Sequence, residues 1–86
     1  MNKVTGKIVD KISKTPIHEA VVLLKNEKLA LNDIAQLSDE NGKFEWVDLE
    51  VGEYTIQIIS ELYTSKVLTF ICTVDSVLNF MIALER

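Results

Sequence analysis

The stretch that decides the fold is LSDENGKFEWVDLEVGEYTIQI, residues 37–58. It begins with an acidic turn that ends at Gly42, and an alternating run through Phe44 and Trp46 follows. A second turn, which ends at Gly52, leads into another alternating run. Alternation with a period of two is typical of β-strands, whose successive side chains point to opposite faces. Two such runs joined by a short turn predict consecutive strands of a β-meander.

The same period of two continues through the rest of the chain, and no helical stripe is longer than a turn or two. The predicted strands cover about residues 3–10, 19–26, 29–37, 43–49, 52–60, 65–73 and 77–85. Their spacing is close to the roughly 8 to 12 residues that is typical of sandwiches. We therefore predict an all-β fold, a seven-stranded antiparallel Greek-key β-sandwich.

Length and composition predict a single domain over residues 1–86. A chain of this length buries about 60% of the surface that it exposes when unfolded, which is enough to fold without disulfides or metal ions. Hydrophobic residues make up 48% and charged residues 26%, which argues against disorder and against fibrous repeats. The single cysteine, Cys72, excludes an internal disulfide and a cysteine-based metal cage.

Charge and hydropathy argue against two classes of partner. The net charge is −4 and the pI is about 4.8, and no two basic residues are adjacent. Because such a surface repels phosphate backbones, we expect no nucleic-acid partner. No apolar run approaches the ~20 residues that a membrane helix needs, so we expect no direct membrane insertion. The first ten residues also lack the apolar core of a signal peptide.

The alternation assigns one face of each strand to the core. The predicted core residues are Ala20, Val22, Leu24, Phe44, Trp46, Tyr54, Ile56, Ile58, Leu78, Phe80, Ile82 and Leu84. The opposite faces are not uniformly polar. Their large apolar residues are Val9, Val21, Leu23, Ile59, Val67, Ile71, Val77 and Met81. A small sandwich rarely leaves so many large apolar side chains outside unless something covers them.

Four short motifs follow one another along the chain. They are Val4-x-Gly6-x-Ile8-x-Asp10, Pro16-Ile17-x-x-Ala20-x-Val22, Ser38-Asp39-x-Asn41-Gly42-x-Phe44 and Leu49-x-x-Gly52-x-Tyr54. In this order and spacing they closely resemble the carboxypeptidase regulatory-like domain, over essentially the whole chain. The resemblance implies a transthyretin-like (prealbumin-like) β-sandwich. Two positions depart from the family pattern, because Glu19 and Leu62 stand where members often have glycine.

The resemblance also implies an accessory role. Members follow the catalytic domain in some metallocarboxypeptidases, and they occur in bacterial exported and cell-surface proteins. The latter include the N-terminal extensions of outer-membrane receptors of the TonB-dependent type. In these settings the domain is non-catalytic, so the resemblance supplies no catalytic residue.

The acidic turn raises the question of a metal site. Asp39, Glu40 and Asn41, with Asp33, could offer oxygen ligands to calcium, but the full calcium-loop spacing is missing. Asp39 can instead accept a backbone N–H from its own turn, and Asn41-Gly42 suits a tight hairpin. We favour the turn, and we predict no metal site and no cofactor.

Catalysis would depend on His18, the only histidine, paired with Cys72 or a serine. Nothing in the sequence brings such a partner to it. Hydroxyisourate hydrolases, enzymes that have the same fold, are associated with a histidine-rich site that one histidine cannot supply. We therefore predict no catalytic residues and a chain that is not an enzyme.

An isopeptide cross-link is a further alternative, of the kind that surface-adhesin domains of related sandwich type form between lysine and asparagine. Lys3 or Lys7 could react with Asn79, promoted by Glu45. The alternation places Lys7, Glu45 and Asn79 on outward faces, where no dry environment would shift the pKa of the lysine. We do not expect this reaction.

Surfaces are the remaining functional feature. We predict a non-catalytic accessory module of a larger exported bacterial protein, in the periplasm or at the cell surface, that contacts a neighbouring domain or a second copy. The predicted interaction surface consists of Val21, Leu23, Ile59, Tyr63, Val67 and Met81. The alternative is a carbohydrate-binding module, since aromatic faces stack on sugars. Trp46 and Tyr54 fit the core better, whereas Tyr63 is expected in an exposed loop.

Overall fold

The computed structural model describes residues 1–26 and 34–86. Its strands are β1 (Lys3–Asp10), β2 (Val21–Lys25), β3 (Ile34–Leu37), β4 (Lys43–Val47), β5 (Gly52–Ile59), β6 (Lys66–Cys72) and β7 (Val77–Leu84). The predicted strands have this order and closely similar bounds, although part of the strand predicted at 29–37 lies outside the described residues. The described part of the chain contains no helix that could span a membrane.

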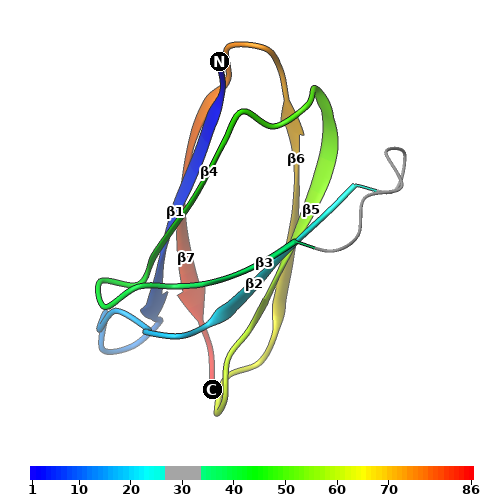
Figure 1. The fold of residues 1–86 in the computed structure, drawn as a ribbon. Helices are drawn as coiled ribbons and strands as arrows, with labels where there is room; N and C mark the ends of the chain where they lie inside the picture. Colours follow the sequence, from blue (N-terminus) through cyan, green and yellow to red (C-terminus); the bar gives the residue numbers. More distant parts are fainter. Residues whose placement is uncertain (27–33) are drawn as a thin grey trace.

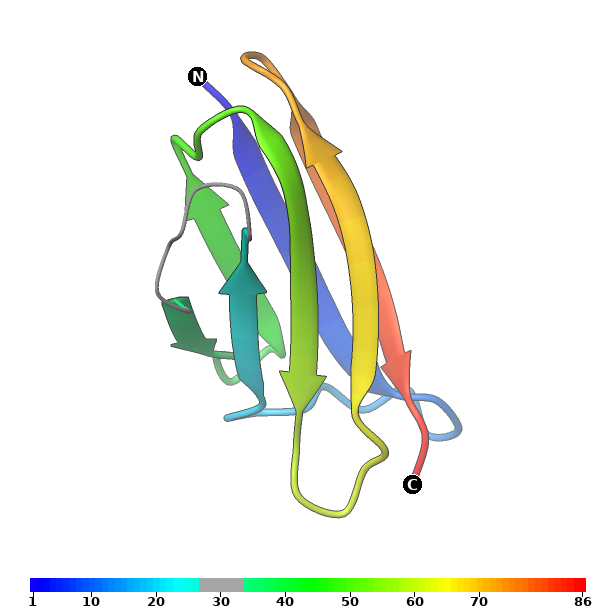
Figure 2. The ribbon, with the colours of Figure 1, turned by 90° about the vertical axis from the view of Figure 1, so that its right-hand side faces the viewer.

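The strands form two sheets that face each other as two layers (Figure 1). The three-stranded sheet has the order β4-β1-β7, and the four-stranded sheet has the order β3-β2-β5-β6. Figure 2 shows the four-stranded sheet in front, with β6 and β7 along one side of the sandwich and β3 and β4 along the other. The prediction of a seven-stranded all-β sandwich is confirmed.

One strand pair corrects the expectation of wholly antiparallel sheets. β1 and β7 run parallel, with Lys3 opposite Val77 and Asp10 opposite Leu84. The reason is that β6 and β7 belong to different sheets, so β7 enters the three-stranded sheet from the end at which β1 begins (Figure 2). A parallel pair needs such a connection, because a tight hairpin can join only antiparallel neighbours.

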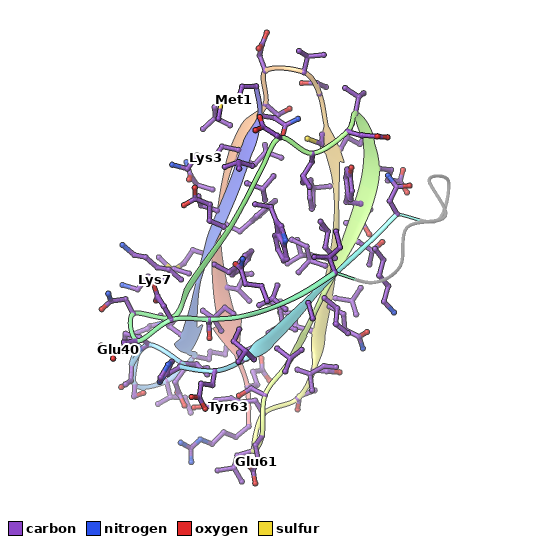
Figure 3. All side chains as sticks on the ribbon, viewed as in Figure 1. Met1, Lys3, Lys7, Glu40, Glu61 and Tyr63 are labelled. Atoms are coloured by element: carbon purple, nitrogen blue, oxygen red, sulfur yellow. The ribbon has the colours of Figure 1, made fainter. Side chains whose placement is uncertain are left out.

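The core lies between the two layers, where side chains from both sheets fill the space (Figure 3). The twelve residues predicted for it are buried, except that Leu78 and Phe80 are only partly buried against it. Val9 was expected outside but is 7% exposed. Its burial follows from the loop after β1, which turns back so that Pro16 pairs with Val9.

Two buried polar residues tie loops to the sandwich. The Ser38 hydroxyl donates to the carbonyl oxygen of Ile17 (2.7 Å) and accepts the N–H of Ala20 (2.9 Å). Asn2 accepts the N–H of Leu49 (2.8 Å) and donates to its carbonyl oxygen (2.6 Å). Since both side chains are buried, these bonds offset the cost of removing them from water.

The two departures from the family pattern coincide with unusual backbone geometry. Glu19 has a φ of 62° and Leu62 a φ of 72°, both in the left-handed region. Glycine adopts this region freely, whereas a side chain costs about 1 to 2 kcal/mol there. The chain thus keeps a glycine-type conformation at both positions without the glycine.

Candidate interaction surfaces

The outer face of the four-stranded sheet carries a contiguous apolar area. The strand register places Val21 between Leu37 and Ile59, and in the next row Leu23 lies between Ala35 and Gln57. Gln57 in turn pairs with Val67 on β6. We call this area the sheet patch and define it as Val21, Leu23, Ala35, Leu37, Ile59 and Val67.

The sheet patch is open to solvent and has a polar boundary. Leu37 is 57% exposed and Val67 is 58% exposed. The following row along the sheet contains Lys25, Thr55 and Thr69, so the apolar area ends there. An exposed apolar area with a polar rim is the usual anatomy of a protein-protein contact.

Four of the six residues predicted for the interaction surface lie in the sheet patch. Sequence reasoning missed Ala35 and Leu37, although they alternate with Gln36 in the expected way. This alternation is visible in the sequence, but it does not show which strand β3 pairs with. Met81 was placed wrongly, because β7 belongs to the three-stranded sheet and Met81 is exposed on the outer face of that layer.

Tyr63 is also not part of an exposed patch. Its ring packs against the core, and its hydroxyl donates to Asp10 Oδ2 (2.8 Å). The guanidinium group of Arg86 lies 5.4 Å from the ring centroid. The loop between β5 and β6 therefore folds inward at this residue, near the C-terminal end of the sandwich (Figure 3).

Asp10 is the centre of the hydrogen bonds at this end. Its Oδ1 accepts the backbone N–H groups of Ser13 (3.0 Å) and Ile12 (2.8 Å). The Ser13 N–H, the Tyr63 hydroxyl and the Ile12 N–H all favour the ionised carboxylate, and they lower its pKa from 3.8 to about 2. The sequence motif contained Asp10, but no sequence pattern indicated its partner Tyr63.

Replacing Asp10 by asparagine should remove an acid-dependent part of the stability. Because the folded-state pKa of Asp10 is lowered, its stabilising effect is present above pH 3.8 and is lost as the pH falls toward about 2. The difference in stability between the native chain and Asp10→Asn should therefore shrink across this range. Urea denaturation at a series of pH values from 2 to about 6 measures it, and a difference that stays constant would contradict the assignment.

The outer face of the three-stranded sheet carries a shallow, more polar concavity. Glu45, Thr5 and Asn79 form one row across it, and Lys3 and Lys7 flank this row. Lys3 and Lys7 point away from the core (Figure 3). Lys3 Nζ lies 3.7 Å from Glu45 Oε1, with both side chains about half exposed. The isopeptide candidates thus lie on an outward face, as expected.

The acidic turn is an Asx turn. Asp39 Oδ1 accepts the N–H groups of Asn41 (2.8 Å) and Lys43 (2.9 Å). The Lys43 N–H is the larger cause of the lowered pKa of Asp39. Within residues 1–26 and 34–86 no group of three acidic, histidine or cysteine side chains could hold a metal ion, and Asp33 lies outside the described residues. The interpretation of this segment as a turn is confirmed, but the predicted hairpin and β-meander are wrong: β4 belongs to the three-stranded sheet, whereas β3 and β5 belong to the four-stranded sheet, so β4 pairs with neither of its neighbours in sequence.

The aromatic residues that a sugar platform would need are used inside the fold. Trp46 is buried edge-to-face against Phe44, with ring centroids 5.5 Å apart. Tyr54 is buried in a stack on Phe70, also at 5.5 Å. Trp46 and Tyr54 at least are therefore not available to stack on a sugar, and Tyr63 is half-buried, with its hydroxyl bound to Asp10 and the Arg86 guanidinium over its ring.

The candidate residues for catalysis are not brought together. His18 is exposed in the segment between Pro16 and Ala20. Cys72 is buried at the C-terminal end of β6. This end of β6 and the segment between β1 and β2, which contains His18, lie at opposite ends of the sandwich (Figure 2). Burial raises the pKa of the Cys72 thiol, which makes it a poorer nucleophile.

No protein-family model matches the chain, and no curated protein matches it either. Solved structures do match. The 5-hydroxyisourate hydrolase of Klebsiella pneumoniae has a TM-score of 0.71 at 19% identity, over 96% of this chain and 90% of that chain. The major pilin subunit BcpA of Bacillus cereus has a TM-score of 0.80 at 16% identity, over 98% of this chain but 29% of that chain.

A third match is a type II cohesin-X-dockerin complex from Acetivibrio cellulolyticus, with a TM-score of 0.61 at 26% identity. It covers 93% of this chain and 53% of that chain. The chain thus spans less than a third of the pilin subunit and about half of the chain in the complex. The fold is a transthyretin-like β-sandwich.

One prediction is overturned by these matches. We expected that the chain is not an enzyme, because the resembled family is non-catalytic and the chain has a single histidine. This expectation is contradicted by the match to a hydrolase, which has the same fold over nearly its whole length. The narrower label of a carboxypeptidase regulatory-like domain is not confirmed.

Proposed function

We propose that the chain is a protein-interaction module of a larger exported or cell-surface protein, of the carboxypeptidase regulatory-like type. The sheet patch contacts a neighbouring domain of the same polypeptide. The observation that carries this proposal is the patch itself, with apolar side chains from β3, β2, β5 and β6 in two adjacent rows. Contacts between domains of one chain are typically of this mixed, moderately apolar kind.

The solved structures support a neighbouring domain as the partner. In the pilin subunit and in the cohesin-X-dockerin complex, the match covers only part of a longer chain. One of these proteins is a pilin subunit and the other is part of a cohesin-X-dockerin complex. A partner that is covalently linked can be held by a small patch, because its effective concentration is high.

Cysteine labelling tests this contact in cells that produce the whole native polypeptide, with the purified chain as the reference. Ile59→Cys puts a thiol in the sheet patch, and Ile71→Cys puts one on the same face outside it, where residue 71 pairs with Glu53. We expect residue 59 to react with a maleimide several-fold more slowly in the native polypeptide than in the purified chain. Residue 71 should react equally in both. The buried Cys72 contributes little background.

The two labelling rates separate the outcomes. Equal protection of residues 59 and 71 would mean general crowding, and no protection of residue 59 in the native polypeptide would overturn the proposal. Since Ile59 is 42% exposed and Ile71 is 67% exposed, both variants should fold. Matching thermal unfolding curves would confirm this.

A further inference from the structure

The two edges of the three-stranded sheet differ in how they are protected. On β4, the Gln36 side chain donates to the carbonyl oxygen of Glu45 (3.0 Å) and accepts its N–H (2.7 Å). The Gln36 amide thus imitates a neighbouring strand and closes this edge. Among the strands that the structure describes, β7, at the other edge, has a partner only on the side of β1.

The backbone of β7 shows which of its groups face outward. The carbonyl oxygens of Ser76 and Leu84 accept N–H groups of Lys3 (2.9 Å) and Lys11 (3.0 Å), so they face β1. Peptide groups alternate along a strand, and therefore those of the odd-numbered residues point away from the sheet. Near the C-terminal end, Lys66 Nζ lies 3.4 Å from the carbonyl oxygen of Ala83 and covers it. The open part of the edge runs from residue 77 to residue 81.

This edge has the properties of a pairing surface. β7 reads VLNFMIAL and contains no charged residue and no proline, the usual means of blocking an edge strand. The core is also incomplete on this side, because Leu78 and Phe80 of β7 and Leu68 of β6 are only partly buried. These residues belong to both layers of the sandwich.

We propose that a second copy of the chain pairs with the free edge of β7, antiparallel to it, across a two-fold axis at Asn79. Val77 then lies opposite Met81 of the second copy, and each Asn79 lies opposite the other. Odd-numbered residues of one β7 lie opposite odd-numbered residues of the other, so the outward N–H and C=O groups of the two strands can form hydrogen bonds with each other. The two three-stranded sheets become one continuous sheet.

A second copy fits this side better than a single strand from another protein. A single strand would cover β7 alone, whereas a second copy brings two layers with the same separation and so covers Leu68 as well. Charge agrees with the pairing. The same register brings Asp75 of the second copy to the end of β7 where Lys66 lies, and Asp75 is exposed.

The axis residue also suits its position. Asn79 Oδ1 accepts the hydroxyl of Thr5, which holds the side chain on the outer face. An amide carries both donors and acceptors, so two Asn79 side chains can bond across the axis. This contact uses a surface other than the sheet patch and does not depend on the proposed function.

Charge exchange at residue 79 tests the pairing. Sedimentation equilibrium of the purified chain over a concentration series should show a dimer. Asn79→Lys and Asn79→Asp each place like charges opposite one another and should weaken the dimer by roughly tenfold or more at low salt. An equimolar mixture of the two variants should restore it, which a misfolded variant could not do.

Position 57 provides the matched control. Gln57→Lys and Gln57→Asp carry the same charges in the middle of the other sheet and should leave the dimer intact. In the native dimer, the amide hydrogens of Asn79 and Met81 should exchange more slowly than at monomer concentrations. A strict monomer at millimolar concentration, or a mixture that fails to associate, would overturn the proposal. So would a dimer that the Gln57 variants disrupt equally, since it would form through the sheet patch.

Discussion

Replacing Tyr54 with alanine should remove a large part of the stability of the folded chain. Tyr54, the third residue of β5, is 1% exposed, stacks on Phe70, and donates its hydroxyl to the carbonyl oxygen of Glu50 (2.7 Å). Truncating a buried aromatic residue costs about 3 to 5 kcal/mol, because the cavity cannot close fully. Domains of this size are typically stable by only about 5 to 15 kcal/mol.

Urea denaturation followed by Trp46 fluorescence measures this loss, since Trp46 is the only tryptophan and is buried. Tyr54→Phe is the matched control: it keeps the ring and removes only the hydrogen bond, so we expect a loss of about 1 kcal/mol. Val67→Ala, on an exposed side chain, should be nearly neutral. If Tyr54→Ala lowered the free energy of unfolding by less than about 1 kcal/mol, the assignment of Tyr54 to a tightly packed core would be wrong.

The strands and most of the core could be predicted because one face of each strand meets water and the other does not. The period of two records this difference directly, as in Ala20, Val22 and Leu24. Leu78 and Phe80 belong to the same pattern, yet they stay partly exposed because, within residues 1–26 and 34–86, no strand lies beyond β7. The pattern predicts the face of the sheet on which a side chain lies, but not how completely other residues cover that side chain.

The residues of the sheet patch could be predicted only in part, for a related reason. Alternation does not say which sheet a strand joins, and so Met81 was grouped with residues of the opposite layer. Pairing between β1 and β7 links positions more than seventy residues apart, and no local pattern encodes it. Tyr63 lies in a loop, where there is no alternation to read, and its position depends on a bond to the distant Asp10.

The family resemblance was most useful where the chain departs from it. Glu19 and Leu62 replace expected glycines, and both adopt positive φ. Positive φ is the conformation that glycine adopts freely, so the two substitutions mark two strained turns in this chain. The comparison with the family pattern thus pointed to these positions, but it did not predict their backbone geometry.

Gly6→Ala should destabilise the fold by about 2 kcal/mol because it overpacks the core. A Cβ atom at residue 6 would lie far inside van der Waals contact with the ring of Phe44, which is itself held against Trp46. The backbone of Gly6 does not have positive φ, so the requirement for glycine here is one of space alone. Shortening the opposing side chain should therefore remove the penalty.

A double-mutant cycle between Gly6→Ala and Phe44→Leu tests this reasoning, with stability measured by urea denaturation. We expect Phe44→Leu alone to be destabilising, and Gly6→Ala to be nearly neutral in that background. Gly42→Ala is the control, because Gly42 has a φ of 75° and faces the backbone of Ile8. The loss of stability caused by Gly42→Ala should be the same whether residue 44 is Phe or Leu. Additive losses for residues 6 and 44 would show that the glycine is needed for a reason other than the ring, since steric conflict between two side chains must disappear when one of them is shortened.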